Sequence, residues 1–312
     1  MKDRIRDIVP VVALVLLVAG FASYEPGFVR PANLLGLTAD TMTLFLMASG
    51  ATLVIMLGSI DLSIQAVASM TSCIVAAMLP QYGALALVAA LAAGAAAGLV
   101  SGLVVNYLRI PSFVATLAVG GIVTSVAYWA SDTRSVYISQ EDQDAWLDWA
   151  TGTFLGLDSE IWVGLVALLV LSVVLQLTRF GRMVRAVGSQ EQAVIASGID
   201  VNRIKLAAFV ISGFMAGLAG VVMGARLGSG SPTLANEFLL PAIACIIVGG
   251  TAITGGVGAI WKTFVGALIV AVVRIGMTFV GVTVLAQQIV FGLVLVLAVA
   301  MTMDRSKVAT VK

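Results

Sequence analysis

Residues 41–79 read TMTLFLMASGATLVIMLGSIDLSIQAVASMTSCIVAAML, and Asp61 is the single charged residue among them. A helix needs about 20 consecutive, mostly apolar residues to cross the hydrocarbon core of a bilayer. The stretch is long enough for two such helices, and we place the break between them at Gly58-Ser59-Ile60-Asp61. It therefore predicts a pair of membrane-spanning helices.

The rest of the chain has the same apolar character. Of its 312 residues, 60% are hydrophobic and 11% are charged, whereas soluble domains have roughly 25% charged residues. We predict an all-α fold, a polytopic helical membrane bundle in which residues 1–312 form one domain of about ten spans. The apolar runs lie at about 8–23, 41–58, 62–79, 83–105, 112–130, 161–178, 206–227, 239–256, 259–281 and 283–303. We interpret the first run as an uncleaved span rather than a signal peptide.

Basic residues set the orientation, because lysine and arginine are enriched in cytoplasmic loops. With the N-terminus inside, alternation of the spans puts most of the 17 basic residues on the cytoplasmic side, together with the C-terminus. Residues 131–160 then form an acidic external loop, and residues 179–205 form the longest cytoplasmic loop. The tryptophans at 146, 149 and 162 predict an interfacial ridge or a short surface helix in or beside the external loop.

The cytoplasmic loop contains VGSQEQAVIASGI at residues 187–199. Ser189, followed by Gln192 three residues later, predicts a capping box at a helix start, and Gly198 predicts its end. A helix of about two turns is not stable alone in water and needs a surface to pack on. Two interpretations stay open, namely a docking element for a partner protein and a connector lying on the bilayer.

Asp61 and Ser63 lie between two apolar runs. An ionisable residue at membrane depth is costly and usually faces protein or water, which favours a place beside a permeation path. Alternatively, Asp61 or Ser63 caps the next helix for structural reasons. The two roles are compatible, and we favour the capping role.

Small residues recur at four-residue spacing within two predicted spans. Such spacing lets helix backbones approach closely, and we favour packing within one subunit over a dimer interface. The glycines lie at 94, 98 and 102, and again at 213 and 217 and at 220, 224 and 228. A short similarity between residues 58–63 and residues 249–254 further suggests two parallel half-repeats.

Several kinds of chemistry have no support in the sequence. The chain has no histidine, and both of its cysteines lie in apolar runs, so we expect no metal site, no cofactor and no catalytic residues. The segment after Gly249-Gly250 superficially resembles a phosphate loop, but Trp261 stands where glycine is needed before Lys262. We therefore expect no nucleotide site, no enzyme activity and no nucleic-acid partner. An ion-coupled secondary transporter remains the alternative, although it needs ion-binding groups at the midplane.

Five stretches, taken in order, resemble the permeases of the ribose, xylose and galactoside branch of ABC importers. Ser59 and Gln65 depart from that pattern, because the family usually has glycine at both positions. The five stretches are FVRPANLL at 28–35, GSIDLSI at 58–64, RIPSFVATL at 109–117, residues 188–198, and SPT at 231–233 with VGGT at 248–251 and GGVG at 255–258.

The resemblance implies a subunit of the bacterial inner membrane that imports a simple sugar or polyol. Its implied partners are an ABC ATPase subunit, a periplasmic sugar-binding protein, a second permease copy or a sister permease, and the lipid bilayer that surrounds the permease. The implied ATPase-coupling residues are Gly188, Glu191, Ala193, Ala196 and Gly198. The candidates for the translocation path are Asp61, Ser63, Phe113, Thr116 and Thr251.

Overall fold

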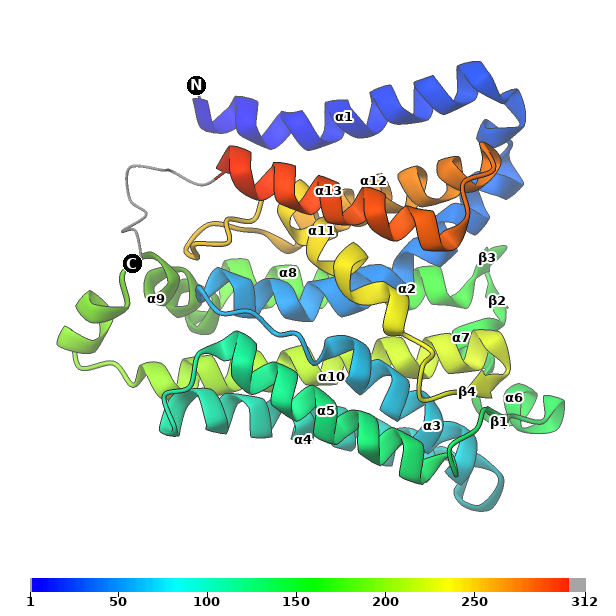
Figure 1. Ribbon diagram of the computed structural model, residues 1–312, viewed down its shortest axis with the longest axis horizontal. Helices are drawn as coiled ribbons and strands as arrows, with labels where there is room; N and C mark the ends of the chain where they lie inside the picture. The colour runs from blue at the N-terminus through cyan, green and yellow to red at the C-terminus, as the bar shows by residue number, and fades with distance from the viewer. Residues whose placement is uncertain (1, 303–312) are drawn as a thin grey trace.

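A computed structural model of the chain describes residues 2–302. It shows a bundle of long helices whose axes lie roughly along one line (Figure 1). Seven helices among the described residues are long and apolar enough to cross a membrane. They are α2 (Pro31–Met56), α3 (Ile64–Tyr82), α4 (Ala84–Tyr107), α5 (Ser112–Ala130), α8 (Ser159–Leu177), α10 (Val201–Leu227) and α12 (Ile260–Phe279). The chain is thus a polytopic helical membrane protein, as predicted.

The remaining apolar helices leave the predicted count of about ten spans open. The helix α1 (Lys2–Tyr24) has a shorter apolar part from Ile8 to Tyr24, and α13 (Val284–Thr302) is the last helix described. The span expected over residues 239–256 is wrong in its length, because α11 (Leu239–Val248) has only 10 residues. At 1.5 Å per residue, a helix of that length covers only about half of the hydrocarbon core.

The two ends of the bundle differ in what they carry (Figure 1). We call one end the inner end; it holds α9 (Arg179–Ala196) and the connection between α4 and α5. The opposite, outer end holds α6 (Gln140–Trp146) and several short elements. These are α7 (Asp148–Thr151), β1 (Val136–Tyr137), β2 (Thr153–Phe154), β3 (Leu157–Asp158), β4 (Ser229–Gly230), η1 (Pro26–Val29) and η2 (Asn236–Phe238).

The helix α2 forms the centre of the bundle. Every residue from Thr41 to Met56 is buried, and Phe45 and Leu53 have no exposed surface. A helical stretch without a charged side chain on any face can be enclosed on all sides. The helices α10, α11, α12 and α8 pack around it. By contrast, α4, α5 and α8 leave large apolar side chains exposed, as expected for lipid-facing helices.

Two breaks interrupt the helical bundle: the first break (residues 57–63) follows α2, and the second break (residues 249–259) follows α11. Both begin with a Schellman cap, in which a glycine of positive φ turns the chain out of the helix. Gly58 has φ +76°, its N–H donates to Ile55 O, and the Ser59 N–H donates to Val54 O. Because the positive φ falls on Gly58, the departure from the family pattern at Ser59 costs nothing.

The second break repeats this geometry one residue later than the sequence comparison suggests. Gly250 has φ +95° and donates to Ile247 O, and the Thr251 N–H donates to Ile246 O. Gly250, rather than Gly249, is therefore the structural counterpart of Gly58. The two half-repeats stay a prediction, but the register of the similarity shifts by one residue.

The glycine spacing in α4 and α10 packs these two helices against each other. A Cβ atom on Gly98 would lie 2.1 Å from Phe209 O, and one on Gly213 would lie 2.2 Å from Gly94 O. In the same way, a Cβ atom on Gly220 would lie 2.0 Å from Ala68 O on α3. The prediction of close packing within one subunit is confirmed for these glycines.

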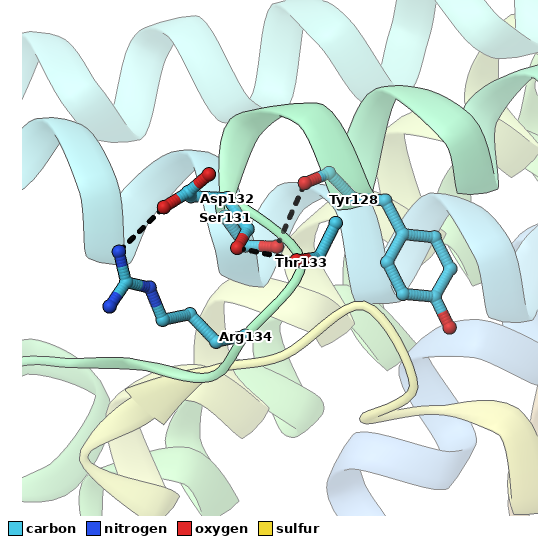
Figure 2. A network of polar contacts seen from close by, with 5 residues as sticks. All are labelled: Tyr128, Ser131, Asp132, Thr133 and Arg134. Carbon is cyan, nitrogen blue, oxygen red and sulfur yellow. Dashed lines mark hydrogen bonds and ion pairs between the residues drawn. The ribbon is translucent and has the colours of Figure 1, made fainter.

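The external loop folds into short, hydrogen-bonded pieces. Val136 pairs with Gly230, and Tyr137 with Ser229, so that β1 and β4 form a small antiparallel ladder. Where the loop leaves α5, the Thr133 N–H donates to Tyr128 O at 2.8 Å. Figure 2 shows the ion pair between Arg134 and Asp132, at 2.5 Å, in the same turn. The predicted short surface helix is confirmed in α6, which ends at Trp146.

Candidate functional site

The carboxylate of Asp61 holds the first break against two helices. Its side chain is only 2% exposed. Oδ1 accepts from the Ser63 N–H at 3.0 Å and from the Ser63 hydroxyl at 2.6 Å, and Oδ2 accepts from the Ser212 hydroxyl on α10 at 2.8 Å. Ser63 itself is the N-cap residue of α3, with no side-chain cap bond. Asp61 thus supplies the hydrogen bond at the start of α3 while joining the break to α10.

The first turn of α5 holds the backbone of the same break. The Ser112 hydroxyl accepts from the Ile60 N–H, and the Thr116 hydroxyl accepts from the Leu62 N–H, each at 3.0 Å. Non-helical backbone at membrane depth needs such partners, because no water is available in the bilayer core. Three predicted path residues, Asp61, Ser63 and Thr116, therefore meet at the first break.

The other two path candidates lie elsewhere. Phe113 is on the first turn of α5 and is 50% exposed. Thr251 follows α11 and is 2% exposed, and its hydroxyl has no hydrogen-bond partner among the described residues. A buried hydroxyl without a partner is unusual in a native protein, so Thr251 is a polar group that remains available at the start of the second break.

Three backbones meet at the inner end in what we call the glycine junction: Met56–Gly58, Gly188–Ser189 and Gly255–Gly256. The Gly256 N–H donates to Met56 O at 2.8 Å, which satisfies a carbonyl left free at the end of α2. A Cβ atom on Gly188 would lie 1.8 Å from Met56 O and 2.4 Å from Gly256 N. Only glycine fits at position 188, and α9 therefore contacts the second break and the last residue of α2, which directly precedes the first break.

The helix α9 consists of two helical pieces joined at Gln190, which has an extended backbone (φ −161°, ψ 81°). The expected capping box is wrong, because the Ser189 hydroxyl donates to Arg185 O in the preceding turn at 2.8 Å. The expected end is confirmed: Gly198 has φ +78° and forms a Schellman cap with Ile199. We call residues 191–197 the distal helix of α9.

The distal helix is anchored on one side and free on the other. Val194 is buried, and the Glu191 carboxylate pairs with Lys205 Nζ at 2.7 Å, which fixes the distal helix to the start of α10. Ala193 and Ala196 are exposed at the inner end of the bundle. A Cβ atom on Gly198 would meet nothing within 4 Å. The distal helix therefore presents small side chains on an open surface.

The sequence analysis does not single out two residues that matter for this site. Ser112 and Ser212 are each one serine among many in apolar runs, yet they hold Ile60 and Asp61. Ser212 is 151 positions from Asp61 along the chain, and only the packing of α10 brings them together. Ser112 lies inside the RIPSFVATL stretch, which is the one clue that the sequence offers.

The molecule is a membrane bundle in which α9, at the inner end, packs against the end of α2 and against the second break. The sequence comparison decides what kind of bundle it is: the family described as "Branched-chain amino acid transport system / permease component" matches residues 33–299. The chain belongs to this permease family. The match covers both breaks, the glycine junction and the distal helix.

Similar proteins include named sugar permeases. The chain is 36% identical over 293 residues to the ribose import permease protein RbsC of Escherichia coli, covering 92% of this chain and 91% of that protein. It is 34% identical to the probable ABC transporter permease protein YphD of Escherichia coli, covering 96% and 90%. It is 32% identical to the L-arabinose ABC transporter permease protein AraH of Azospirillum brasilense, covering 93% and 85%. No solved structure matches the chain.

The protein is therefore a multi-pass permease subunit of an ABC transporter in the bacterial inner membrane. In such transporters ATP is hydrolysed by a separate subunit. The permease provides the route through the membrane, and a conformational change in the ATPase has to reach that route through a contact on the permease surface.

Proposed function

We propose that this permease is the membrane-spanning subunit of an ATP-driven, binding-protein-dependent importer of a simple sugar or polyol. Relatives at 32–36% identity over more than 90% of this chain are named for ribose and arabinose import. Their full-length similarity includes both breaks, which supports a shared transport route. The ion-coupled transporter is disfavoured, because the family and the relatives are ABC permeases.

The glycine junction is the observation that supports the coupling mechanism. An ATPase bound to Ala193, Ala196 and Gly198 would push on a distal helix whose neighbour, Gly188, is in backbone contact with Met56 and Gly256. Displacement of α9 would then act on both breaks together. An ATPase can shift the permease between outward-facing and inward-facing states only if it binds the two states with different affinity.

The remaining partners follow from the proposed direction of transport. The periplasmic binding protein would deliver the sugar to the outer end, where α6, α7 and the β1–β4 ladder form the exposed surface. A second copy of this permease, or a sister permease, would complete the route. Both termini would be cytoplasmic; α1 begins at the same end of the bundle as α9 (Figure 1), whereas the C-terminal basic residues lie outside the described residues.

Transport in proteoliposomes tests the proposed function. The permease is reconstituted with its ATPase, and the purified binding protein is supplied outside together with labelled D-ribose, L-arabinose, D-xylose, D-galactose or a polyol. We expect uptake of one class of sugar that requires ATP and survives collapse of the proton and sodium gradients. Uptake that continues without ATP and stops when an ion gradient is collapsed would overturn the proposal.

The docking surface is tested separately by adding bulk and charge to one exposed alanine. Ala196→Arg, on the distal helix, is expected to abolish ATPase binding and uptake while membrane insertion stays normal. Ala145→Arg, on exposed α6 at the outer end, is the matched control and should leave ATPase binding unchanged. If both variants bind the ATPase as wild type does, the ATPase docks elsewhere. Reversing the charge at Glu191 should also weaken docking, although it breaks the Lys205 pair as well.

A further inference from the structure

A cavity with a mixed polar and apolar lining opens in the outer half of the bundle, between α2, α10, η2 and α12. Its volume is about 540 Å³, which falls in the range of small-molecule sites (about 300–1,000 Å³). Its polar lining is formed by Asp40, Thr43, Arg226, Glu237, Arg274 and Thr278. Four charged side chains around one cavity at the edge of a membrane bundle call for an explanation, because such groups are costly there unless they face water, a partner or a ligand.

Three of these charged side chains make contacts that join elements of the bundle. Arg226 pairs with Asp40 and also with Glu160 at 3.2 Å, so it joins α10 to α2 and α8. Glu237 accepts a hydrogen bond from Gln288 Nε2 on α13. These contacts leave further acceptor positions on both carboxylates, since each carboxylate can accept about four hydrogen bonds.

Arg274 has no such structural partner. No ion pair among the described residues includes Arg274. Its guanidinium lies over the ring of Phe238, 4.9 Å from the ring centroid, where it is oriented by a cation–π contact. Its side chain lines the cavity. The five N–H donors of a guanidinium are therefore held at the cavity wall without a carboxylate to receive them.

We propose that this outer cavity binds a neutral, polyhydroxylated solute, with Arg274 as the principal donor and with Glu237 and Asp40 as acceptors. The lining has two carboxylates and two guanidinium groups, so it has no net charge to attract an ion. A hydroxyl group both donates and accepts, and neighbouring hydroxyls of a sugar can bond to a guanidinium and a carboxylate at once. The choice of a sugar over a zwitterionic amino acid rests on the proposed function.

The cavity would bind the sugar transiently, after its release by the binding protein and before its passage past the breaks. It lies at the outer end, where the binding protein would release the sugar. Its lining includes residues of α2 and α12, whose opposite ends border the first and second breaks. A site that loads and unloads in every cycle has to bind weakly. We therefore expect half-saturation only at millimolar sugar.

Protection of an engineered thiol tests the site directly in the assembled transporter. Thr278→Cys places a thiol in the cavity lining, and both native cysteines are fully buried, so they give no background. The sugar that the wild-type transporter takes up should slow modification by a membrane-impermeant thiol reagent about fivefold, the factor expected at about 80% occupancy. L-leucine should give no protection. Ser135→Cys, on the exposed external loop, should be unaffected by the sugar.

A second variant links protection to Arg274. Arg274→Gln should abolish protection of the thiol and raise the KM for uptake about tenfold, the loss expected for a charge-assisted hydrogen bond. Arg274→Lys should recover part of both effects, and Arg30→Gln, at the outer end away from the cavity, should change neither. The amount of monodisperse transporter extracted from membranes shows whether each variant folds.

The outcomes separate this inference from the proposed function. If no sugar is taken up by the wild type, the proposed function fails and the inference fails with it. If a sugar is taken up but the thiol at 278 reacts at the same rate with and without it, the proposed function stands and the cavity is not a sugar site. Protection by leucine instead of sugar would reassign the cavity to amino acids and overturn the inference.

Discussion

At the scale of single residues, Asp61 is a buried charged group held by several hydrogen bonds. It accepts three hydrogen bonds while being almost completely buried. From the sequence alone, Asp61 can be either a residue of the translocation path or the cap of the next helix. The contacts show that Asp61 fixes the start of α3 and binds α10, and a role in the path remains a proposal beside this structural one.

Replacing Asp61 tests how much of its role is structural. Asp61→Ala leaves the Ser63 and Ser212 donors without an acceptor, and each buried donor left unsatisfied costs about 1–3 kcal/mol. We expect a clear fall in Tm of the detergent-solubilised permease. Ser212→Ala should lower Tm less, and the double variant should lose less than the sum, because the two residues share a hydrogen bond. An unchanged Tm with abolished uptake would instead assign Asp61 to the path alone.

Gly188 is the second residue whose role can be isolated. A methyl group at this position would collide with Met56 O, which is main chain and cannot move without moving α2. Gly188→Ala should therefore displace α9 from the breaks, uncouple ATP hydrolysis from uptake, and destabilise the fold by about 1–3 kcal/mol. Gly36→Ala has open space around its Cβ position and serves as the control. Full coupling in Gly188→Ala would mean that the junction transmits nothing.

At the scale of helices and breaks, local signals predict most of what is observed. The break near Gly58 and the helix end at Gly198 follow from glycine positions, since only a residue that accepts positive φ can form a Schellman cap cheaply. The span expected over 239–256 misses the early end of α11, because the apolar run continues past Gly249-Gly250 and hydropathy alone cannot locate a break. The contact between Ser212 and Asp61 is non-local, and no pattern in a single sequence predicts it.

The contact between α4 and α10 gives a prediction at this scale. Gly98→Ala would bring a methyl group to within about 2 Å of a backbone carbonyl on α10, and separating the helices costs about 1–3 kcal/mol. We expect a lower Tm and less folded protein in membranes. The matched variant Gly121→Ala, on α5, has no atom within 4 Å of its Cβ position, so it should be neutral or slightly stabilising. Equal Tm values for the two variants would show that the helices do not pack as described.

At the scale of the whole molecule, composition and charge predict the class of protein. The contact of α9, which includes the distal helix, with the end of α2 and the second break can be seen only in the three-dimensional structure. Met56, Gly188 and Gly256 are far apart along the chain, and the two glycines are the only clue that the sequence offers. The fold brings them into one junction at the inner end. The outer cavity is equally invisible in the sequence, because its charged residues come from four separate elements.

Sided labelling of the distal helix is the most direct test of the central claim, that a small inner-face helix receives the ATPase and transmits its motion to the breaks. Gln192→Cys is exposed on the distal helix. An impermeant thiol reagent should modify it only in inside-out vesicles, and bound ATPase should slow the reaction, whereas Ser135→Cys should react only from the outside. Modification of Gln192→Cys in intact, right-side-out cells would contradict the account.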